Sequence, residues 1–414
     1  MSAARRFSAK TFAALSVRNF RLYFLGQLVS VSGTWMQTVA QGWLVLQMTG
    51  SSVDLGIAIA LQYLPMLLFG SYGGLVADRY EKRRILYFTQ ASAGLLALVL
   101  GLMVTTDHVT VNSVYAVAFV LGLVNLFDVP ARQAFVQEMV GRDLIANAVS
   151  LNGVLMNAGR VVGPGIAAGL IAIVGTAACF YTNAASYLAV LAALAMMRSR
   201  EFLPMRTVER QGGQLRLGLK YVFQTPLLRN VILAVAVVGT FAFNFTTTLP
   251  MLAHTTFHQK TAAQYGILMG AMGLGATIGG LVVAYRSRPT PKLLAVLSLG
   301  FGLFMTSVAF APTLLWAEIL LIPTGACSIA FVSTANATLQ LNSSQHMRGR
   351  VMSLYGMAFL GTTPIGALLI GLIIAATNPR IGLFVGSLLT LVTGLGLVLT
   401  VRQNVRSTEK LQTA

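Results

Sequence analysis

The segment GGLVADRYEKRR, residues 73–84, recurs in altered form as GGLVVAYRSRP at residues 279–289. The two copies start 206 residues apart in a chain of 414, one residue short of half its length. A second pair, GRDLIANAVSLNG at 141–153 and GRVMSLYG at 349–356, keeps nearly the same separation. The chain is therefore predicted to consist of two copies of one structural plan.

Long apolar stretches surround both repeats, six in each half of the chain. Each is long enough to cross about 30 Å of hydrocarbon as a helix. The twelve stretches cover residues 22–46, 54–77, 85–105, 111–131, 144–174, 176–197, 230–250, 262–285, 292–311, 313–339, 351–376 and 380–401. We therefore predict an all-α membrane protein with twelve transmembrane helices in two six-helix halves, related by a pseudo-two-fold axis along the membrane normal.

The predicted halves are joined by one long polar segment. The first half covers residues 1–197 and the second covers 230–401, with a basic linker at 198–229 and a basic tail at 402–414. The composition agrees with a membrane protein, because the chain is 56% hydrophobic and only 10% charged, with a mean hydropathy of +0.75. A water-soluble fold of this length would not carry that composition.

The positive charges are distributed with a clear alternation. Of the 29 Lys and Arg residues, 26 lie at the termini or in every second gap between apolar stretches. The remaining gaps hold only Lys260 and Arg380, and Arg160 lies within a stretch. The positive-inside rule therefore predicts that both termini are cytoplasmic.

The net charge of +18 raises the question of a nucleic-acid partner. The basic residues are dispersed among short loops and do not form one groove-sized surface, so we predict no nucleic-acid binding. Membrane topology and contact with anionic lipid headgroups account for them.

The repeated segment also carries charges close to hydrocarbon. Asp78 and Arg79 lie at the predicted membrane edge, and Asp128 and Arg132 are four residues apart near the end of the 111–131 stretch, so they can face each other on one helix. A carboxylate near lipid is costly unless it is paired, and these four residues are predicted to form one cluster. Gly73 and Gly74 would let helices approach closely.

GGLVADRYEKRR resembles the signature loop between the second and third helices of the major facilitator superfamily, G-x-x-x-D-R-x-x-R-R. The resemblance covers the whole chain. The amino-acid sequence of residues 20–51, 127–140 and 347–356 is similar to that of the enterobactin-exporter-like branch of the superfamily, the transmembrane secretion effectors. It implies a bacterial inner-membrane transporter that exports small molecules, including siderophores and drugs.

In the superfamily, the signature loop is implied to lock the outward-facing state by bridging the second, fourth and eleventh helices. The second copy has Ala284 and Tyr285 in place of Asp78 and Arg79, so a latch here would be one-sided. The alternative is that these charges only set loop topology. The predicted latch consists of Gly73, Gly74, Asp78, Arg79, Arg83, Arg84, Asp128 and Arg132.

Polar residues form a stripe along the 22–46 stretch, at spacings of three and four. A polar stripe on an apolar helix must face protein or water, because lipid offers no hydrogen-bond partners. The 230–250 stretch, its counterpart in the repeat, carries Thr240, Asn244 and Thr247. We predict that both stripes line a central substrate cavity; the alternative is hydrogen bonding between helices. The predicted lining is Gln27, Ser30, Thr34, Gln37, Gln41 and Asn244, with Trp35 and Phe243 as stacking surfaces.

The 144–174 stretch contains a cation and a glycine–proline sequence. Arg160, with Asn157 one turn before it, lies in the middle third, where a charge is a functional hypothesis by default. We assign both residues to the substrate cavity, where Arg160 would bind an anionic substrate or pair with a carboxylate; the alternative is a purely structural pairing. The surrounding residues Gly159, Gly163, Pro164 and Gly165 resemble, in degraded form, the Gly-Pro motif of superfamily antiporters.

Proton coupling would need an acid within the membrane. The candidates are Glu318 in the 313–339 stretch, Asp54 at the start of the 54–77 stretch, and Asp128. Glu318 is the best placed for a cavity role, although solvation at the end of its stretch is an equal alternative.

Other classes of protein fit the sequence less well. It has no nucleotide-binding loop, nucleophile elbow, metal-ligand spacing or soluble catalytic domain, so we predict no enzyme, no cofactor and no metal. A channel would need a charged or carbonyl-lined ring, and a receptor or scaffold would not need the polar stripe. The predicted function is secondary active export of drug-like compounds or siderophores by alternating access, with protons as the coupling ion and no obligate protein partner. The alternative is an uptake permease or facilitator for a small metabolite.

Overall fold

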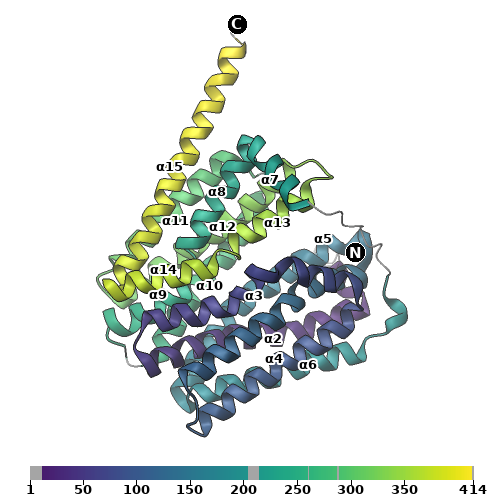
Figure 1. The fold of residues 1–414 in the computed structure, drawn as a ribbon, viewed down its shortest axis with the longest axis vertical. Helices are drawn as coiled ribbons and strands as arrows, with labels where there is room; N and C mark the ends of the chain where they lie inside the picture. The colour runs from purple at the N-terminus through teal and green to yellow at the C-terminus, as the bar shows by residue number, and fades with distance from the viewer. Residues whose placement is uncertain (1–11, 204–213, 260, 287–288, 413–414) are drawn as a thin grey trace, which may run out of the picture. The chain divides into compact units, whose positions relative to one another are not determined.

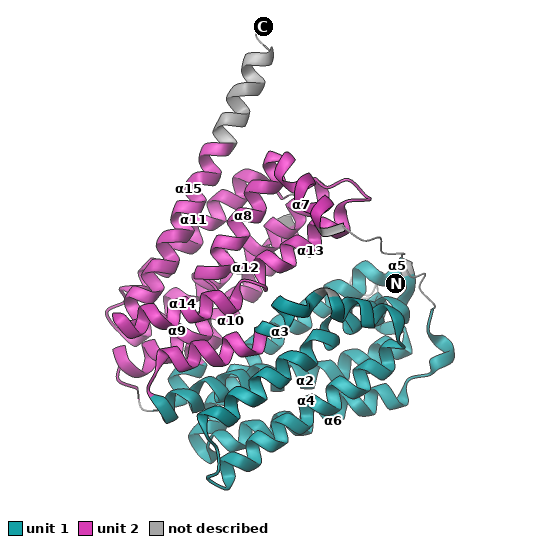
Figure 2. Cartoon of the chain, viewed as in Figure 1, with its two compact units in different colours: residues 1–49, 64–209, 261–266 teal, residues 50–63, 210–260, 267–414 magenta. Residues whose placement is uncertain are grey.

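The computed structural model describes residues 12–203, 214–259, 261–286 and 289–412, and in this part of the chain every regular element is helical (Figure 1). The side chains of residues 71, 142, 214–215, 286 and 401–412 lie outside the description. The chain forms two compact units (Figure 2). Unit 1 comprises Met1–Thr49, Leu64–Glu209 and Thr261–Gly266, and unit 2 comprises Gly50–Tyr63, Arg210–Lys260 and Ile267–Ala414.

Most elements belong to one unit, but α3 (Ser52–Arg79) and α10 (Ala262–Arg286) contribute to both. The other elements of unit 1 are η1 (Ala13–Ser16), α2 (Arg18–Thr49), α4 (Lys82–Thr105), α5 (Val111–Val174), α6 (Thr176–Met196) and η2 (Ser199–Glu201). Those of unit 2 are α7 (Gln214–Gln224), α8 (Pro226–Phe241), α9 (Phe245–Met251), the π-helical turn η3 (Leu252–Thr256), α11 (Pro291–Ala309), α12 (Leu314–Leu341), α13 (Arg348–Phe359), α14 (Thr363–Ala376) and α15 (Pro379–Gln412).

Eleven helical stretches of the described residues are long and apolar enough to cross a membrane. The twelfth predicted span corresponds to α2, which has 32 residues but is not among the eleven. Its polar side chains lower its mean hydropathy, so length and composition alone do not identify it as a span. The chain is a multi-pass membrane protein, and the twelve-helix topology with its two-fold axis remains a prediction.

Threonine is the N-cap residue of three helices. In each case the side-chain oxygen accepts a hydrogen bond from the backbone N–H three residues later, which satisfies a donor at the helix start. These N-cap residues are Thr110 before α5, Thr290 before α11 and Thr313 before α12. At Thr110 the bond is reciprocal, because Ser113 Oγ accepts from the Thr110 N–H.

In unit 1, α2 packs against α5 and α6, and α4 packs against the same two helices. The core at one end of these helices includes Phe20 and Tyr23 of α2 and Phe135 of α5, all almost fully buried. The predicted spans 111–131 and 144–174 lie in two helices, Val111–Gly141 and Asp143–Val174, which together make up α5 and are separated by a kink at Gly141. Gly141 has φ 72°, a left-handed conformation that a residue with a side chain adopts only with strain.

Two predicted helices of unit 2 are interrupted. The stretch 230–250 is split between α8 and α9 by residues 242–244, and the stretch 351–376 is split between α13 and α14 by residues 360–362. Pro364 explains the second break, because proline lacks an N–H and its ring clashes with the carbonyl four residues earlier, at Leu360.

Candidate functional site

A buried charged network connects three helices of unit 1. Asp128 on α5 is 1% exposed and forms an ion pair with Arg132, one turn along the same helix. Its other carboxylate oxygen accepts hydrogen bonds from Thr89 Oγ1 at 2.8 Å and Gln90 Nε2 at 2.7 Å, both on α4. Arg132 Nη1 donates to Gln27 Oε1 of α2 at 3.1 Å.

This network gives Asp128 the partners that a buried carboxylate needs. A charge removed from water is tolerated when it is paired and its remaining lone pairs accept hydrogen bonds. Three buried polar atoms around it have no hydrogen-bond partner among the described residues: Arg132 Nε, Gln90 Oε1 and the Tyr23 hydroxyl. A water molecule or a rearrangement of side chains could therefore supply hydrogen bonds to these three atoms.

Sequence reasoning identified Asp128 and Arg132 but missed Thr89 and Gln90. The available signal was a pair of adjacent polar residues near the start of an otherwise apolar stretch. The sequence predicts that Gln27 lines the substrate cavity, whereas in the structure Gln27 Oε1 accepts a hydrogen bond from Arg132. A single sequence does not show which helix such a side chain faces.

The residues of the signature loop have different environments. Gly73 is buried where α3 meets α5, and a side chain there would clash with the carbonyl oxygen of Leu126. Gly74 and Asp78 are half-buried and Arg79 is exposed at the end of α3. The inclusion of Asp78 and Arg79 in one cluster with Asp128 remains a prediction.

Two arginines of the loop make other contacts. Arg83 donates from Nε and Nη2 to the Leu194 carbonyl at 3.0 and 2.6 Å, and from Nη1 to Ser199 Oγ at 2.6 Å. It thereby fixes the start of α4 to the end of α6. Arg84 forms an exposed ion pair with Glu81, a type of contact that stabilises proteins little.

A further ion pair near this loop was not predicted. Lys82 Nζ lies 3.0 Å from Glu138 Oε1, and both side chains are largely shielded from solvent. The pair links the start of α4 to α5. Opposite charges 56 positions apart carry no sequence signal that would join them.

The polar stripe of α2 is mostly buried within unit 1. Gln27, Ser30, Gln37 and Gln41 are 2–8% exposed, while Thr34 is exposed. Gln37 Oε1 accepts a hydrogen bond of 2.6 Å from Asn183 Nδ2 on α6. Gln27 and Gln37 therefore make bonds between helices, and the cavity role of the stripe remains a prediction.

Arg160 lies over an aromatic ring in unit 1. Its guanidinium carbon is 4.8 Å from the ring centroid of Trp35, within the range of a cation–π interaction. Both side chains are half-buried, as is Asn157 one turn before Arg160. A cation held in this way at mid-span keeps its charge partly stabilised and accessible.

The glycine–proline sequence brings α5 against α2. At Gly163 an added Cβ would lie 2.6 Å from both the Ser32 carbonyl oxygen and Trp35 Cβ, so only glycine permits this approach. Gly159 faces Val31 in the same way. Pro164 is buried, and nothing lies within 4 Å of a Cβ added at Gly165.

In unit 2 the predicted cavity residues lie at the break between α8 and α9. The Phe243 ring makes edge-to-face contacts with Phe359 at 5.0 Å and Phe301 at 5.5 Å between centroids. Asn244 is 4% exposed and donates to the Thr240 carbonyl at 2.6 Å. Aromatic contacts thus hold Phe243 at the break, and the Asn244 amide satisfies a carbonyl near the end of α8.

The other candidate acids are less buried than Asp128. Glu318 is half-buried on the fifth residue of α12, between the exposed Leu315 and Ile319. Asp54 is half-buried in the first turn of α3, where its backbone N–H donates to Ser51 Oγ.

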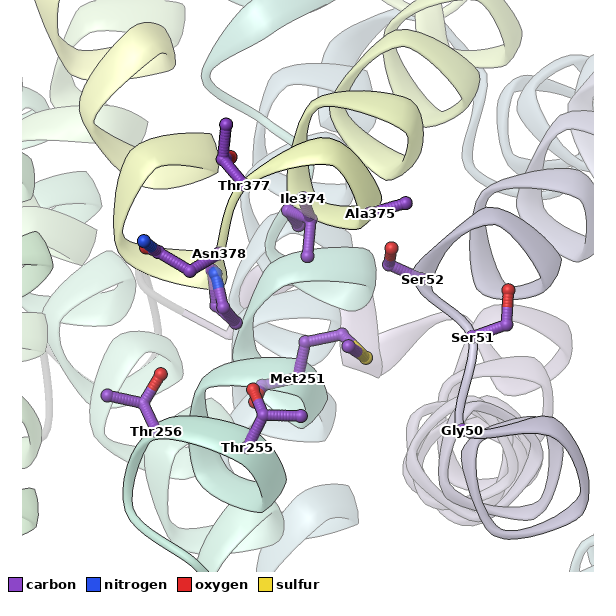
Figure 3. A pocket seen from close by; sticks show the side chains of 11 residues that line it. Gly50, Ser51, Ser52, Met251, Thr255, Thr256, Ile374, Ala375, Thr377 and Asn378 are labelled. Atoms are coloured by element: carbon purple, nitrogen blue, oxygen red, sulfur yellow. The ribbon is translucent and has the colours of Figure 1, made fainter.

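Unit 2 has a hollow of about 420 Å³ between the start of α3, the turn η3 and the junction of α14 with α15 (Figure 3). Its wall carries hydroxyl and amide groups, including Thr255, Thr256 and Asn378. Ser52 Oγ donates to the Gly371 carbonyl at 2.8 Å and fixes α3 to α14 beside it. A second hollow of about 440 Å³, in unit 1, is mainly apolar and is lined by residues of α2, α5 and α6. The predicted site residues line neither hollow.

The described part of the chain is built of helices, eleven stretches of which are long and apolar enough to cross a membrane, and this defines a multi-pass membrane protein. Residues 9–414 match the family described as transmembrane secretion effectors. The chain belongs to this family, within the major facilitator superfamily.

The chain resembles characterised transporters over most of its length. It is 27% identical to the multidrug efflux pump Tap of Mycolicibacterium fortuitum, covering 84% of this chain and 88% of the relative. It is 26% identical to the staphyloferrin A transporter of Staphylococcus aureus, covering 85% and 88%, and 26% identical to the enterobactin exporter EntS of Shigella flexneri, covering 87% and 86%. The family and these relatives are transporters and not enzymes.

Solved structures share the fold at low sequence identity. The nucleoside transporter NupG aligns with a TM-score of 0.71 at 13% identity, covering 92% of this chain and 98% of NupG. A bacterial homologue of the human lysosomal transporter Spinster aligns with the same score and identity, covering 92% and 94%. These likenesses concern the fold alone.

Proposed function

We propose that this chain is a secondary active transporter of a bacterial inner membrane, with both termini cytoplasmic, that exports small molecules by alternating access. The proposed substrates are drug-like compounds or siderophores, in line with the names of the relatives. A proton gradient is the proposed source of energy.

The observation that carries the proposal is Arg160 at mid-span over Trp35. A cation within a membrane span is costly, and such residues mark substrate or ion pathways. The guanidinium presents donors suited to carboxylates and phenolates, and the indole offers a surface for stacking. This pair favours an anionic substrate, or an anionic group on a larger one.

Within this proposal, the Asp128 network holds α2, α4 and α5 as one body, while Asp78 and Arg79 belong to the latch. Because Asp128 has an ion pair and two hydrogen bonds, we assign it a structural role in preference to proton coupling. Glu318 is then the leading candidate for the coupling acid, with Asp54 as the second.

The direct test is accumulation in everted and right-side-out membrane vesicles. Ethidium serves as a cationic probe and a catecholate siderophore as an anionic one, each with and without an imposed proton gradient. Export predicts accumulation in everted vesicles that collapses when the gradient is dissipated. Accumulation confined to right-side-out vesicles would identify an uptake permease.

Arg160→Ala tests the proposed substrate contact. The Michaelis constant for the anionic probe should rise about tenfold or more, because a partly buried charged hydrogen bond contributes roughly 1.5–3 kcal/mol. The Michaelis constant for ethidium should change little. Arg200→Ala removes an exposed arginine and is the matched control. Equal losses for both probes would contradict a role in anion binding.

A further inference from the structure

The short helix α7 lies directly before a membrane span. It ends at Gln224, and after the single residue Thr225 the helix α8 begins at Pro226, the first residue of a candidate span. Because one residue leaves no room for a long connection, the end of α7 at Gln224 lies close to the membrane surface. This placement does not depend on which side of the membrane the linker occupies.

One face of α7 is fixed to unit 2. A Cβ added at Gly218 would be 3.0 Å from Arg350 Cβ of α13, so the two helices are in close contact there. Val222 is 1% exposed, and the Tyr221 hydroxyl accepts a hydrogen bond of 3.2 Å from the Ser344 N–H, just before α13. Figure 1 shows α7 beside α13.

The opposite face combines an apolar row with a basic row. Leu219 and Phe223, four residues apart, are 46% and 51% exposed. Arg216 and Lys220, also four residues apart, are exposed in the adjoining row. A helix at a membrane surface with this pattern places its apolar row among acyl chains and its cations at the level of the headgroups.

We infer that the outer face of α7, formed by Arg216, Leu219, Lys220 and Phe223, is a binding site for anionic phospholipid. Arg216 and Lys220 bind the headgroup phosphates, and Leu219 and Phe223 contact the acyl chains. A neutral lipid would satisfy only the apolar row, so charge complementarity selects the anionic lipid.

The site also has a structural consequence for unit 2. Since the inner face of α7 is packed on α13, bound lipid holds the half-helix that ends at Phe359, before the break at residues 360–362. Anionic lipid should therefore stabilise the folded protein and not merely surround it.

The test measures lipid binding on the purified full-length protein and needs no transported substrate, so its failure would leave the proposed transport function untouched. Phosphatidylglycerol or phosphatidylcholine is titrated into the detergent-solubilised protein while its thermal unfolding temperature is followed. Phosphatidylglycerol should raise this temperature at lower concentration than phosphatidylcholine, and added sodium chloride should weaken the difference by screening.

The variants assign this preference to α7. Arg216→Gln and Lys220→Gln should each raise the half-saturating concentration of phosphatidylglycerol about fivefold, and the double variant by about the product of the two. Phe223→Ser should weaken binding of both lipids. Arg21→Gln combined with Arg200→Gln removes the same charge from exposed positions of unit 1 and should leave the preference intact.

Three results would overturn the inference. The first is that the wild type binds the two lipids equally well. The second is that the phosphatidylglycerol titration is unchanged in the double variant of α7. The third is that the unit 1 control raises the half-saturating concentration of phosphatidylglycerol as much as the double variant does. If the double variant does not fold, Lys220→Gln alone decides the question, because this side chain is exposed and its removal leaves the packed face unchanged.

Discussion

At the scale of single residues, the ion pair of Asp128 and Arg132 is the feature most sensitive to substitution. Both charges are shielded from water, and each depends on the other for compensation. Removing one partner should cost more stability than the intact pair contributes, because it leaves the other charge buried without compensation.

Asp128→Asn should lower the stability of the folded protein by about 3–5 kcal/mol, since Arg132 would keep its charge without a counter-charge. The measurement is the thermal unfolding temperature in detergent, together with folded yield. Glu81→Gln is the control, because it breaks the exposed pair with Arg84 and should have little effect. An Asp128→Asn protein as stable as the wild type would show that the pair is not essential to the fold.

Gln37→Leu distinguishes the two interpretations of the polar stripe. The structure favours bonding between helices at this position, so the substitution should cost about 1–3 kcal/mol by leaving the Asn183 amide without its acceptor. Replacing Asn183 by Leu as well should recover part of this loss. A change in substrate preference with unchanged unfolding temperature would instead assign Gln37 to the cavity wall.

The sequence determines these residue contacts only in part. The spacing of four between Asp128 and Arg132 is enough to place them side by side on one helix. The same spacing says nothing of Thr89 and Gln90, which come from another helix and meet Asp128 only through the packing of α4 on α5. Partners on other helices depend on helix rotation, which a single apolar stretch leaves undetermined.

At the scale of helices, hydropathy supports eleven of the twelve predicted spans, whereas the span at α2 remains a prediction. Eleven stretches are apolar enough to be found by composition, whereas α2 carries the polar stripe that unit 1 uses for internal bonds. The breaks in unit 2 were not predicted either. Pro364 is visible in the sequence, but proline often kinks a helix without ending it, and tertiary packing decides which occurs.

Glycine at position 163 sets the distance between α5 and α2. Gly163→Val should destabilise the protein by about 1–3 kcal/mol or more, because the added carbons would meet the Ser32 carbonyl and the Trp35 side chain. It should also displace Trp35 from Arg160, which lowers transport of the anionic probe in any protein that still folds.

Gly165→Ala is the matched control for this helix. It lies two residues away in the same helix, and nothing is within 4 Å of the added carbon. It should be neutral or slightly stabilising, because alanine restricts the unfolded chain more than glycine does. Comparable losses in both variants would indicate a general effect of glycine replacement on α5, and not a close contact at Gly163.

At the scale of the whole molecule, proton coupling is the property that distinguishes a pump from a facilitator. Glu318→Gln should stop accumulation against a gradient while downhill exchange continues, because an amide cannot release a proton. Both activities are measured in proteoliposomes with an imposed pH difference. Asp107→Asn, which neutralises an exposed acid between α4 and α5, is the control. Undiminished uphill transport by Glu318→Gln would move the coupling role to Asp54, the second candidate.

The hydrogen bonds from Arg83 to the end of α6 have a consequence for folding during synthesis. The arginine at the start of α4 binds a carbonyl of Leu194, 111 residues further along the chain. During synthesis these donors therefore remain hydrated or bound to lipid phosphate until α6 has left the ribosome and entered the bilayer. Unit 1 cannot close residue by residue as it emerges, and its last helix completes the contacts of its earlier ones. Ribosome stalling or truncation before Leu194 should consequently yield an inserted but protease-sensitive intermediate.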